Sequence, residues 1–406
     1  ILGLNQVGTS RFVVPGQDTR ICQAATINLS DANPNAIPGV ITPLSYVPFA
    51  ELNSRTGLQA ATSTAQGGAL VFTTFDTLFG ESGSYQGRFG VTQIKQALHD
   101  SDVLHRTDPN PLQLYALGGD ISGLTLFSPK ASRVLAGQDL TDVALYLQNV
   151  GADDFSIVTA GRDILPYNPN SALRSQATAA GNLLAAGEAP LVGDLQIGGP
   201  GSLEILAGRR LTLGSTPAQA DGTGDGISSI GNLRNPFLTS DGANLIVAAG
   251  VGAATSLNES DLDLEAFISQ YVQGGEGQTY LTELGITDFE SQSAEEQARI
   301  ALEVFYKVLR DAGRNFATVG NYDTANAAID VLFGGISGNG GDIDLSSRGL
   351  KTRNGGNISV VAPGGGISLG SNLGSSLVPP GIITESGGDI SLFSRDSVDV
   401  GVLRIF

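Results

Sequence analysis

The segment Gly387-Gly388-Asp389-Ile390-Ser391-Leu392 decides the fold, because its opening phrase of two glycines, a polar residue and an apolar residue occurs four times in the chain. A glycine pair permits a tight corner, and the residues that follow it alternate between polar and apolar with the period of a β-strand. The other copies lie at residues 118–121, 340–345 and 355–360. Recurring corners followed by short alternating strands predict a solenoid whose turns stack on one another.

A second phrase, Ala-Gly-x-charged-Leu/Ile, occurs at residues 136–140, 160–164 and 207–211, with steps of 24 and 47 residues. If the longer step spans two turns, each turn has close to 24 residues. Stacked parallel strands lie about 4.8 Å apart, so roughly ten turns would form a rod on the order of 50 Å long. Residues 155–160 alternate between two faces, and Leu203, Ile205 and Ala207 repeat this register.

The period changes from two to about 3.6 between residues 257 and 333, which predicts a helical insertion. This segment holds 14 acidic and 4 basic residues, so it carries −10 of the formal net charge of −18. Its apolar stripe is expected to pack on the flank of the solenoid rather than on a partner. A helical stripe is formed by Leu264, Phe267, Ile268, Tyr271 and Val272.

The limits of two further helices can be predicted inside this insertion. Ser293 followed by Glu296 forms a capping box, which opens a helix that we expect to end at Gly313. A shorter helix from Asp323 to Phe333 then returns the chain to the solenoid.

Four regions follow from these patterns: an irregular β region (1–115), a β-helix (116–256), the acidic helical insertion (257–333) and a continuation of the β-helix (334–406). In the first region, residues 69–73 are strand-like, residues 91–99 are typical of a short helix, and residues 31–39 are rich in turn formers. The predicted fold class is therefore an all-β parallel β-helix with an inserted α-helical subdomain.

Composition narrows the class of protein further. The 406 residues include 55 glycines, about twice the usual share, while 41% hydrophobic and 15% charged residues exclude a disordered or collagen-like chain. The charge of −18 disfavours nucleic acid and anionic membranes as partners. The longest nearly apolar stretch, residues 243–255, is too short to insert into a membrane. The sequence starts at Ile1 without a basic and apolar leader, as an excerpt or a processed product would.

Three longer phrases resemble the C-terminal region of filamentous haemagglutinin family exoproteins, the passengers of bacterial two-partner secretion. They are Leu-Phe-Ser-Pro-Lys-Ala-Ser-Arg-Val-Leu-Ala-Gly-Gln-Asp-Leu (126–140), Val-Thr-Ala-Gly-Arg-Asp-Ile (158–164) and Ser-Gly-Gly-Asp-Ile-Ser-Leu-Phe-Ser-Arg-Asp-Ser-Val-Asp-Val (386–400). The helical segment up to Phe333 adds to the resemblance, which covers residues 108–406.

The resemblance implies a right-handed parallel β-helix, secreted to a bacterial cell surface, that serves adhesion, aggregation or biofilm structure. The implied partners are receptors on host or neighbouring cells, or matrix components, with possible self-association. An outer-membrane transporter is implied for a longer parent chain, because the family's secretion domain is not found here. The Asn-Pro-Asn sequences at residues 33–35 and 168–170 are expected to be ordinary turns.

Several residues could in principle carry chemistry. Residues 221–226, Asp-Gly-Thr-Gly-Asp-Gly, have the oxygen ligands and sixth-position glycine of a calcium loop, but Asn232 stands where a bidentate Glu is needed. We therefore expect a solvated loop there, with calcium as the alternative. Cys22 is the single cysteine, so it cannot form an intramolecular disulfide, and it lacks a catalytic signature.

Carboxylates and histidines offer weaker candidates. Asp342 with Asp344, and Asp153 with Asp154, could be the carboxylate pairs of a glycosidase, although solvent-facing turns explain them better. The remaining cluster could hold a transition metal but lacks a diagnostic spacing, and it consists of His99, Asp100, Asp102, His105 and Asp108.

We expect no catalytic, cofactor-binding or metal-binding residue, and no enzyme. Two alternatives to the adhesin remain: a self-assembling extracellular filament subunit, and a carbohydrate-active β-helix lyase or glycosidase.

Overall fold

The computed structural model describes residues 2–3, 6–8, 25–29, 31, 99, 101–165, 195–213, 226–251, 263–333, 341–346, 348–370, 381–401 and 403–405. The sequence predictions for residues 69–73, for the helix before His99 and for the two Asn-Pro-Asn turns lie outside these residues. The same holds for Cys22 and for all of the predicted calcium loop except its last glycine.

Three parallel sheets of eight strands each make up most of this described part of the chain. The first sheet contains β1 (Leu2–Gly3), β4 (Leu112–Ala116), β7 (Ser132–Ala136), β10 (Phe155–Ala160), β13 (Ser202–Ala207), β16 (Asn244–Ala249), β19 (Ile358–Ala362) and β22 (Ile390–Ser394). The second contains β2 (Gln6–Gly8), β5 (Asp120–Ser122), β8 (Leu140–Thr141), β11 (Asp163–Leu165), β14 (Arg210–Thr212), β17 (Ile343–Leu345), β20 (Ile367–Leu369) and β23 (Val398–Val400). The third contains β3 (Ala25–Asn28), β6 (Leu124–Phe127), β9 (Ala144–Gln148), β12 (Leu195–Gly198), β15 (Gly226–Ser229), β18 (Gly349–Thr352), β21 (Ile382–Thr384) and β24 (Leu403–Ile405).

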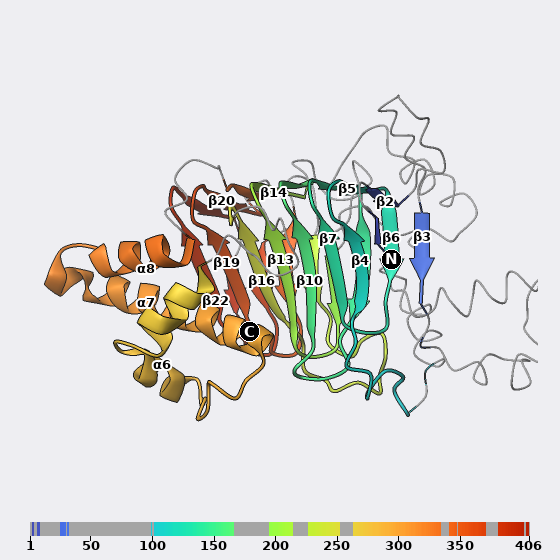
Figure 1. The fold of residues 1–406 in the computed structure, drawn as a ribbon, viewed down its shortest axis with the longest axis horizontal. Coiled ribbons are helices and arrows are strands. Elements are labelled where there is room, and N and C mark those ends of the chain that lie inside the picture. The colour runs from blue at the N-terminus through green and yellow to red at the C-terminus, as the bar shows by residue number, and fades with distance from the viewer. Residues whose placement is uncertain are drawn as a thin grey trace, which may run out of the picture.

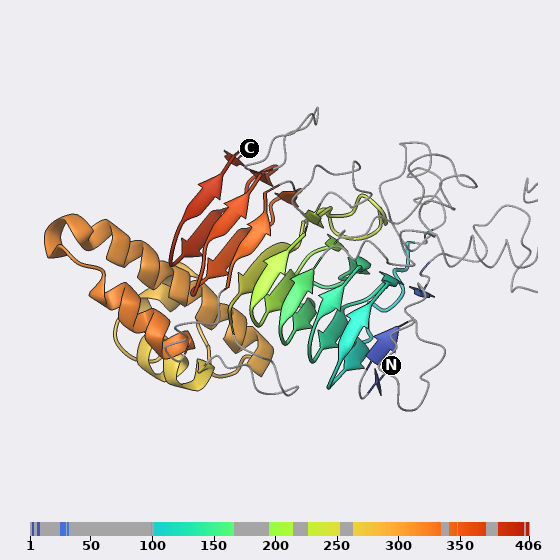
Figure 2. The same ribbon diagram turned by 90° about the horizontal axis from the view of Figure 1, so that it is seen from above.

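The chain visits the three sheets in a fixed order, so that a strand pairs with the strands three places before and after it. The strands consequently lie side by side along the longest axis of the molecule (Figures 1 and 2). Side chains from all three sheets meet in a single hydrophobic cluster, with Val158, Ile164 and Leu195 among its fully buried members. The core therefore lies between the sheets and is shared by successive turns.

Register along the first sheet explains the Ala-Gly phrase. Ala116, Ala136, Ala160 and Ala207 occupy one column of paired positions, and each is completely buried at the corner between the first and second sheets. The alternation within residues 155–160 is confirmed, because Ser156, Val158 and Ala160 pair with Leu203, Ile205 and Ala207.

The predicted turn length was wrong in one place. β10 pairs directly with β13, so the step of 47 residues is one turn and not two. The extra residues fall between Leu165 and Leu195, in the connection from β11 to β12, where they leave the register unchanged. Eight strands in each sheet, not ten, form the described stack.

The Gly-Gly phrase marks two different corners. The copies at residues 118–121 and 340–345 lead into β5 and β17 of the second sheet, whereas those at 355–360 and 387–392 lead into β19 and β22 of the first. At one of these corners the glycine is required by close approach, because a Cβ on Gly388 would lie 2.3 Å from the carbonyl oxygen of Gly356.

The helices form a group between β16 and β17: α5 (Leu264–Phe267), the π-helical turn η1 (Ile268–Val272), α6 (Gly277–Glu283), α7 (Ala294–Val319) and α8 (Asp323–Phe333). Their apolar stripe packs against outward-facing residues of the first sheet, as predicted. Phe267 and Phe305 share a cluster with Ala248 and Val361, and Phe393 packs against that cluster. The group lies at the end of the stack opposite the N-terminus (Figure 1).

The start of α7 agrees with the sequence prediction, but its end does not. The Ser293 hydroxyl accepts a hydrogen bond of 3.2 Å from the backbone N–H of Glu296, while the Glu296 carboxylate pairs with Arg299. The helix continues through Gly313 to Gly320, whose φ of +81° is the left-handed conformation that closes it. A glycine on an exposed helix face costs only about 1 kcal/mol, which a long buried stripe outweighs.

Close packing at the corners generates a paired prediction. A Cβ on Gly161 would lie 2.3 Å from the carbonyl oxygen of Gly137, whereas one on Gly313 would meet nothing within 4 Å. We expect Gly161→Ala to lower the free energy of unfolding by about 1–3 kcal/mol. Gly313→Ala should raise it by about 0.5–1 kcal/mol, because alanine favours the helix. Urea unfolding followed by circular dichroism tests both, and equal effects of the two variants would contradict the close contact.

Candidate functional site

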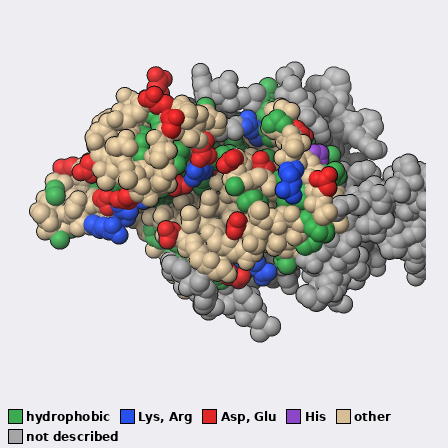
Figure 3. Space-filling model, turned by 90° about the horizontal axis from the view of Figure 1, so that it is seen from below, with side chains coloured by type: hydrophobic (Ala, Val, Ile, Leu, Met, Phe, Trp, Pro, Cys, Tyr) green, Lys and Arg blue, Asp and Glu red, His purple; other side chains and the backbone are tan. Residues whose placement is uncertain are grey.

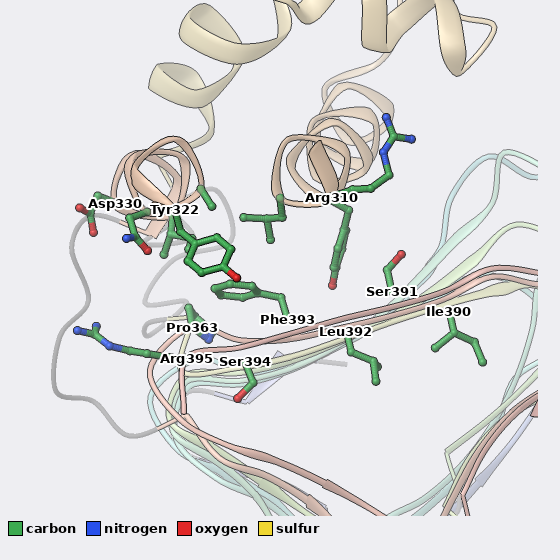
Figure 4. A pocket seen from close by; sticks show the side chains of 15 residues that line it. Arg310, Tyr322, Asp330, Pro363, Ile390, Ser391, Leu392, Phe393, Ser394 and Arg395 are labelled. Carbon is green, nitrogen blue, oxygen red and sulfur yellow. The ribbon is translucent and has the colours of Figure 1, made fainter. Parts of the chain in front are cut away.

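A groove of about 930 Å³ lies between the helical group and the last strand of the first sheet. Its floor is β22, and its roof is formed by α7 and α8. Ser391 and Phe393 point from β22 toward the helices, whereas Ile390 and Leu392 point the opposite way (Figure 4). This alternation follows from the strand pairing, because Ile390 and Leu392 continue the columns of the buried Ile358 and Val360.

The roof is aromatic and aliphatic. Tyr322 is 49% exposed, and its ring stacks on that of Phe316 with 4.5 Å between the centroids. Leu309 and Ile329 add aliphatic surface to the lining. Phe393 links the groove to the helical core, since its ring meets the Phe305 ring edge-on at 6.0 Å.

The two basic residues that line the groove differ in the ion pairs that they form. The Arg310 guanidinium donates to Asp311 at 2.8 and 3.0 Å and to Glu283 at 3.2 Å. By contrast, Arg395 is exposed, and within the described residues its guanidinium makes no ion pair.

A second ionisable cluster lies where α7 crosses the first sheet. Arg299 pairs with Glu296 and Glu303 on its own helix and also faces Glu204 of β13. Burial raises the pKa of Glu204 to about 7, and the charges of Arg299 and Arg133 only partly oppose this. This carboxyl group can therefore change its charge near neutral pH.

The carboxylates considered for a glycosidase instead hold backbone amides. Asp342 Oδ1 accepts from the N–H of Gly366 at 2.8 Å, and Asp344 Oδ1 from that of Ser346 at 3.0 Å. Asp154 Oδ2 accepts from Val150 and Gly151 at 2.7 and 2.8 Å, while Asp153 is exposed in the same turn and not in a strand.

Asp342 belongs to a repeated arrangement in which a side chain of one turn accepts a hydrogen bond from the backbone of the next. At the corner between the first and second sheets, Asp120 accepts from the N–H of Asp139 at 3.0 Å, and Asp139 accepts from that of Asp163 at 3.2 Å. At the corner between the third and first sheets, Asn357 accepts from Asp389 at 2.8 Å and donates its own N–H to Asn244 at 2.9 Å. We call these two rows the Asx ladders.

Arginines reinforce the first ladder. Arg162 donates to both oxygens of Asp139 at 3.0 and 2.6 Å, and Arg209 donates to Asp163 at 2.7 Å. Each arginine therefore reaches back to a carboxylate of the preceding turn.

Elsewhere, acidic side chains are scattered over both the helical group and the sheets (Figure 3).

The predicted histidine cluster is divided between two sites. His99 Nε2 lies 3.0 Å from Asp31 Oδ1 in a buried group, and Gln148 and Asn235 donate to the other oxygen of Asp31. Burial alone would raise the pKa of Asp31, but hydrogen bonds from its neighbours, His99 first among them, leave it lowered.

His105 Nδ1 lies 3.4 Å from Asp108, which also pairs with Lys130. Chiefly through its hydrogen bond from Lys130, the pKa of Asp108 falls to about 2. Throughout the ranges that the structure covers, no three His, Cys, Asp or Glu side chains converge as a metal site would require. The last glycine of the predicted calcium loop, Gly226, begins β15, and its Cβ would lie 2.4 Å from the Gly349 carbonyl oxygen.

No family model, curated protein or solved structure matches the chain. The resemblance to filamentous haemagglutinin exoproteins therefore stays a prediction from the sequence phrases. Among the described helices, none is both long and apolar enough to cross a membrane.

Sequence reasoning missed the groove and the Glu204 cluster, because both depend on which strands the helices cover. The available signal was a column of outward-facing apolar residues in the first sheet, formed by Leu206, Ala248, Val361 and Phe393.

The ladder generates a graded prediction. Asp139→Ala removes the acceptor for both the Asp163 amide and Arg162, and should lower the free energy of unfolding by about 1–3 kcal/mol. Asp139→Asn keeps a neutral acceptor and should cost less. Asp153→Asn, in an exposed turn, serves as the control and should change stability by less than about 0.5 kcal/mol. Urea denaturation tests the order, and an Asp139→Ala effect no larger than the control's would contradict the assigned role.

Glu204 generates a prediction of pH dependence. Its folded pKa of about 7 exceeds the ordinary value of 4.5, because burial favours the neutral carboxyl group. The stability that the folded protein gains from holding this proton is fully present below about pH 4.5 and is lost as the pH rises through about 7. Glu204→Gln should flatten this fall and stabilise the protein at pH 8, by on the order of 1–3 kcal/mol. Unfolding free energies measured from pH 4.5 to 8 test this.

The matched control for Glu204→Gln is Glu290→Gln, because Glu290 is exposed. The control should leave the pH profile of the wild type unchanged. A Glu204→Gln profile parallel to that of the wild type would show that the carboxyl group is ionised at its ordinary pKa.

Proposed function

We propose that the chain forms a right-handed parallel β-helix and serves as a rod segment of a secreted bacterial surface adhesin or extracellular matrix fibre. The observation that carries the rod is the strand order, in which every third strand joins the same parallel sheet. Crossover connections between parallel strands of one sheet are right-handed in about 98% of cases, which supports the proposed hand.

The contacts between turns are suited to a mechanical role. A pulling force along the stack acts on three strand pairings in each turn, one in each sheet. The backbone hydrogen bonds of all three sheets therefore share this force. The Asx ladders and the arginines add side-chain bonds between consecutive turns at the corners. Such a rod holds binding elements at a distance from the cell that displays it.

Adhesion itself is supported by the sequence resemblance. The partners proposed on this basis are receptors on host or neighbouring cells or components of their matrix, and an outer-membrane transporter for a longer parent chain. Three of the four carboxylates considered for a lyase or glycosidase, those of Asp342, Asp344 and Asp154, accept backbone hydrogen bonds in turns and ladders, which supports a rod over a carbohydrate-active enzyme.

Adhesion can be measured with fluorescent beads coated with the folded 406-residue chain. These beads should bind cell monolayers or immobilised matrix proteins several-fold more than beads coated with the heat-unfolded chain, because the binding surface exists only in the folded rod. Beads coated with Asp153→Asn, which leaves the column intact, should behave as the wild type.

Equal binding of folded and unfolded coatings across cells and matrix proteins would refute the adhesin proposal. The hand of the winding is tested separately by an experimental high-resolution structure, in which a left-handed connection between β10 and β13 would refute the proposed β-helix.

A further inference from the structure

The first half of α7 meets the first sheet at Glu204 of β13. Glu204 stands in an outward-facing column, with an isoleucine beside it on each neighbouring strand, and Ser359 of β19 continues this column. Arg299 of α7 lies near Glu204, and Tyr306 of α7 lies near Ser359. These two helix residues are seven positions apart, a rise of about 10.5 Å, which is close to two strand spacings of about 4.8 Å. α7 therefore runs along the column and covers Glu204.

One guanidinium faces three carboxyl groups at this contact. Arg299 donates to both oxygens of Glu296 at 3.2 Å and pairs with Glu303, while the charge of Glu204 acts on it from the sheet. Three carboxylates would together carry more negative charge than Arg299 can balance. Like charges that are held together in a partly buried site cannot all ionise without a cost in free energy.

Two further cations lie near these carboxyl groups. Lys307, one turn beyond Glu303 on α7, pairs with Glu283 of α6 at 2.9 Å. Arg133 stands in the same column as Glu204, two strands away on β7. The charged groups of the cluster around Glu204 are therefore Arg299, Glu296, Glu303 and Lys307 of α7, and Arg133 of β7.

Burial acts on two of the carboxyl groups in the same direction. It raises the pKa of Glu204 to about 7, although the charges of Arg299 and Arg133 oppose this. It also raises the pKa of Glu303, against the charge of Arg299. Both groups therefore resist ionisation while α7 lies on the sheet, and both would regain water if α7 moved away from it.

Apolar side chains form much of the remaining contact. Ile300 and Val304 of α7 share a cluster with Ala248 and Val361 of the sheet. Leu332 of α8 belongs to the same cluster, so the helices also pack on one another. Because apolar contacts do not titrate, the ionisable cluster at Glu204 decides how the docking of the helices responds to pH.

We propose that the contact between α7 and β13 is a pH-sensitive switch, which keeps the helical group docked on the first sheet in mildly acidic solution and allows it to open locally above neutral pH. The charge of Glu204 sets the state of the switch, because the ionised carboxylate is stable in water but not beneath α7. Opening would expose Leu206 and Ala248, two outward-facing residues that pack with the helices in the closed state. This inference rests on the docking of α7 and not on adhesion.

The direction and the pH range follow from the burial of Glu204. In the open state its pKa returns to the ordinary 4.5, so docking is favoured fully below about pH 4.5 and progressively less as the pH rises to about 7. Each unit of difference between the two pKa values changes the equilibrium about tenfold, so opening should increase by on the order of 100-fold over this range.

A thiol placed beneath the helices can report the opening. Ala248 is 5% exposed and packs against helix residues, so Ala248→Cys places a thiol there. Cys22→Ser removes the natural thiol of the intact 406-residue chain. The labelling rate at position 248, divided by that of an unstructured peptide thiol at the same pH, should rise about tenfold or more between pH 5.5 and pH 8.5.

A thiol in the core between the sheets separates local opening from global unfolding. Val158 is completely buried, so Val158→Cys in the same Cys22→Ser background reacts only when the stack itself opens. At pH 8.5 the thiol at position 248 should be labelled about tenfold faster than the thiol at position 158, or faster still, because local opening costs less free energy than global unfolding.

Three further variants in the Ala248→Cys background test the role of the cluster. Glu204→Gln removes the ionisable group and should keep the relative labelling rate constant from pH 5.5 to pH 8.5. Glu303→Gln should reduce the increase, because Arg299 then faces one carboxylate fewer. Glu290→Gln, at an exposed position, is the matched control and should behave as the parent. Circular dichroism checks that each variant folds, and Glu303→Gln still tests the switch if Glu204→Gln does not fold.

A relative labelling rate at position 248 that does not change with pH would overturn the proposal. So would equal rates at positions 248 and 158 at pH 8.5, because the helices would then leave the sheet only on global unfolding. An increase with pH that neither Glu204→Gln nor Glu303→Gln diminishes would overturn it as well.

Discussion

Parallel pairing between strands three places apart in the chain is the constraint on which the rest of this structure depends. It requires each turn to place its corners directly against those of the turn before. The buried alanines that end β4, β7, β10 and β13 are small enough for this requirement. Gly137 and Gly161, which follow two of them, also satisfy it, because a Cβ at either position would meet the backbone of the preceding turn. The close stacking of the corners thus explains part of the high glycine content.

Backbone N–H groups at a corner lie outside the regular hydrogen-bond pattern of the sheets. The side chains of the Asx ladders accept hydrogen bonds from some of these groups. An aspartate or asparagine just before or at the start of a strand accepts from the equivalent amide of the next turn, as between Asp139 and Asp163 and between Asn357 and Asp389. Where the residue is an aspartate, an arginine of the next turn can balance it, as Arg162 does for Asp139. Some of the acidic residues of the chain therefore have a structural role.

Local sequence was enough to predict the parallel stacking and the helical insertion, since period-two alternation and glycine corners are properties of neighbouring residues. It failed where distant residues decide the outcome. The 47-residue step looked like two turns because spacing alone does not reveal which strands pair, and Gly313 looked like a helix end because local propensity ignores a buried stripe. Glu204 and Arg299 lie 95 positions apart in the sequence, so no local pattern predicts their proximity.

The helical group leaves the column after Ala249 and the chain re-enters it at Ile343, which pairs with Leu211 as though nothing intervened. Entry and exit at a single corner mean that an appended subdomain imposes no strain on the strands around it. Evolution can graft, enlarge or delete such an appendage without rebuilding the column. The architecture thus keeps the paired strands separate from the appended helices, and variation in length is expected to concentrate in the latter.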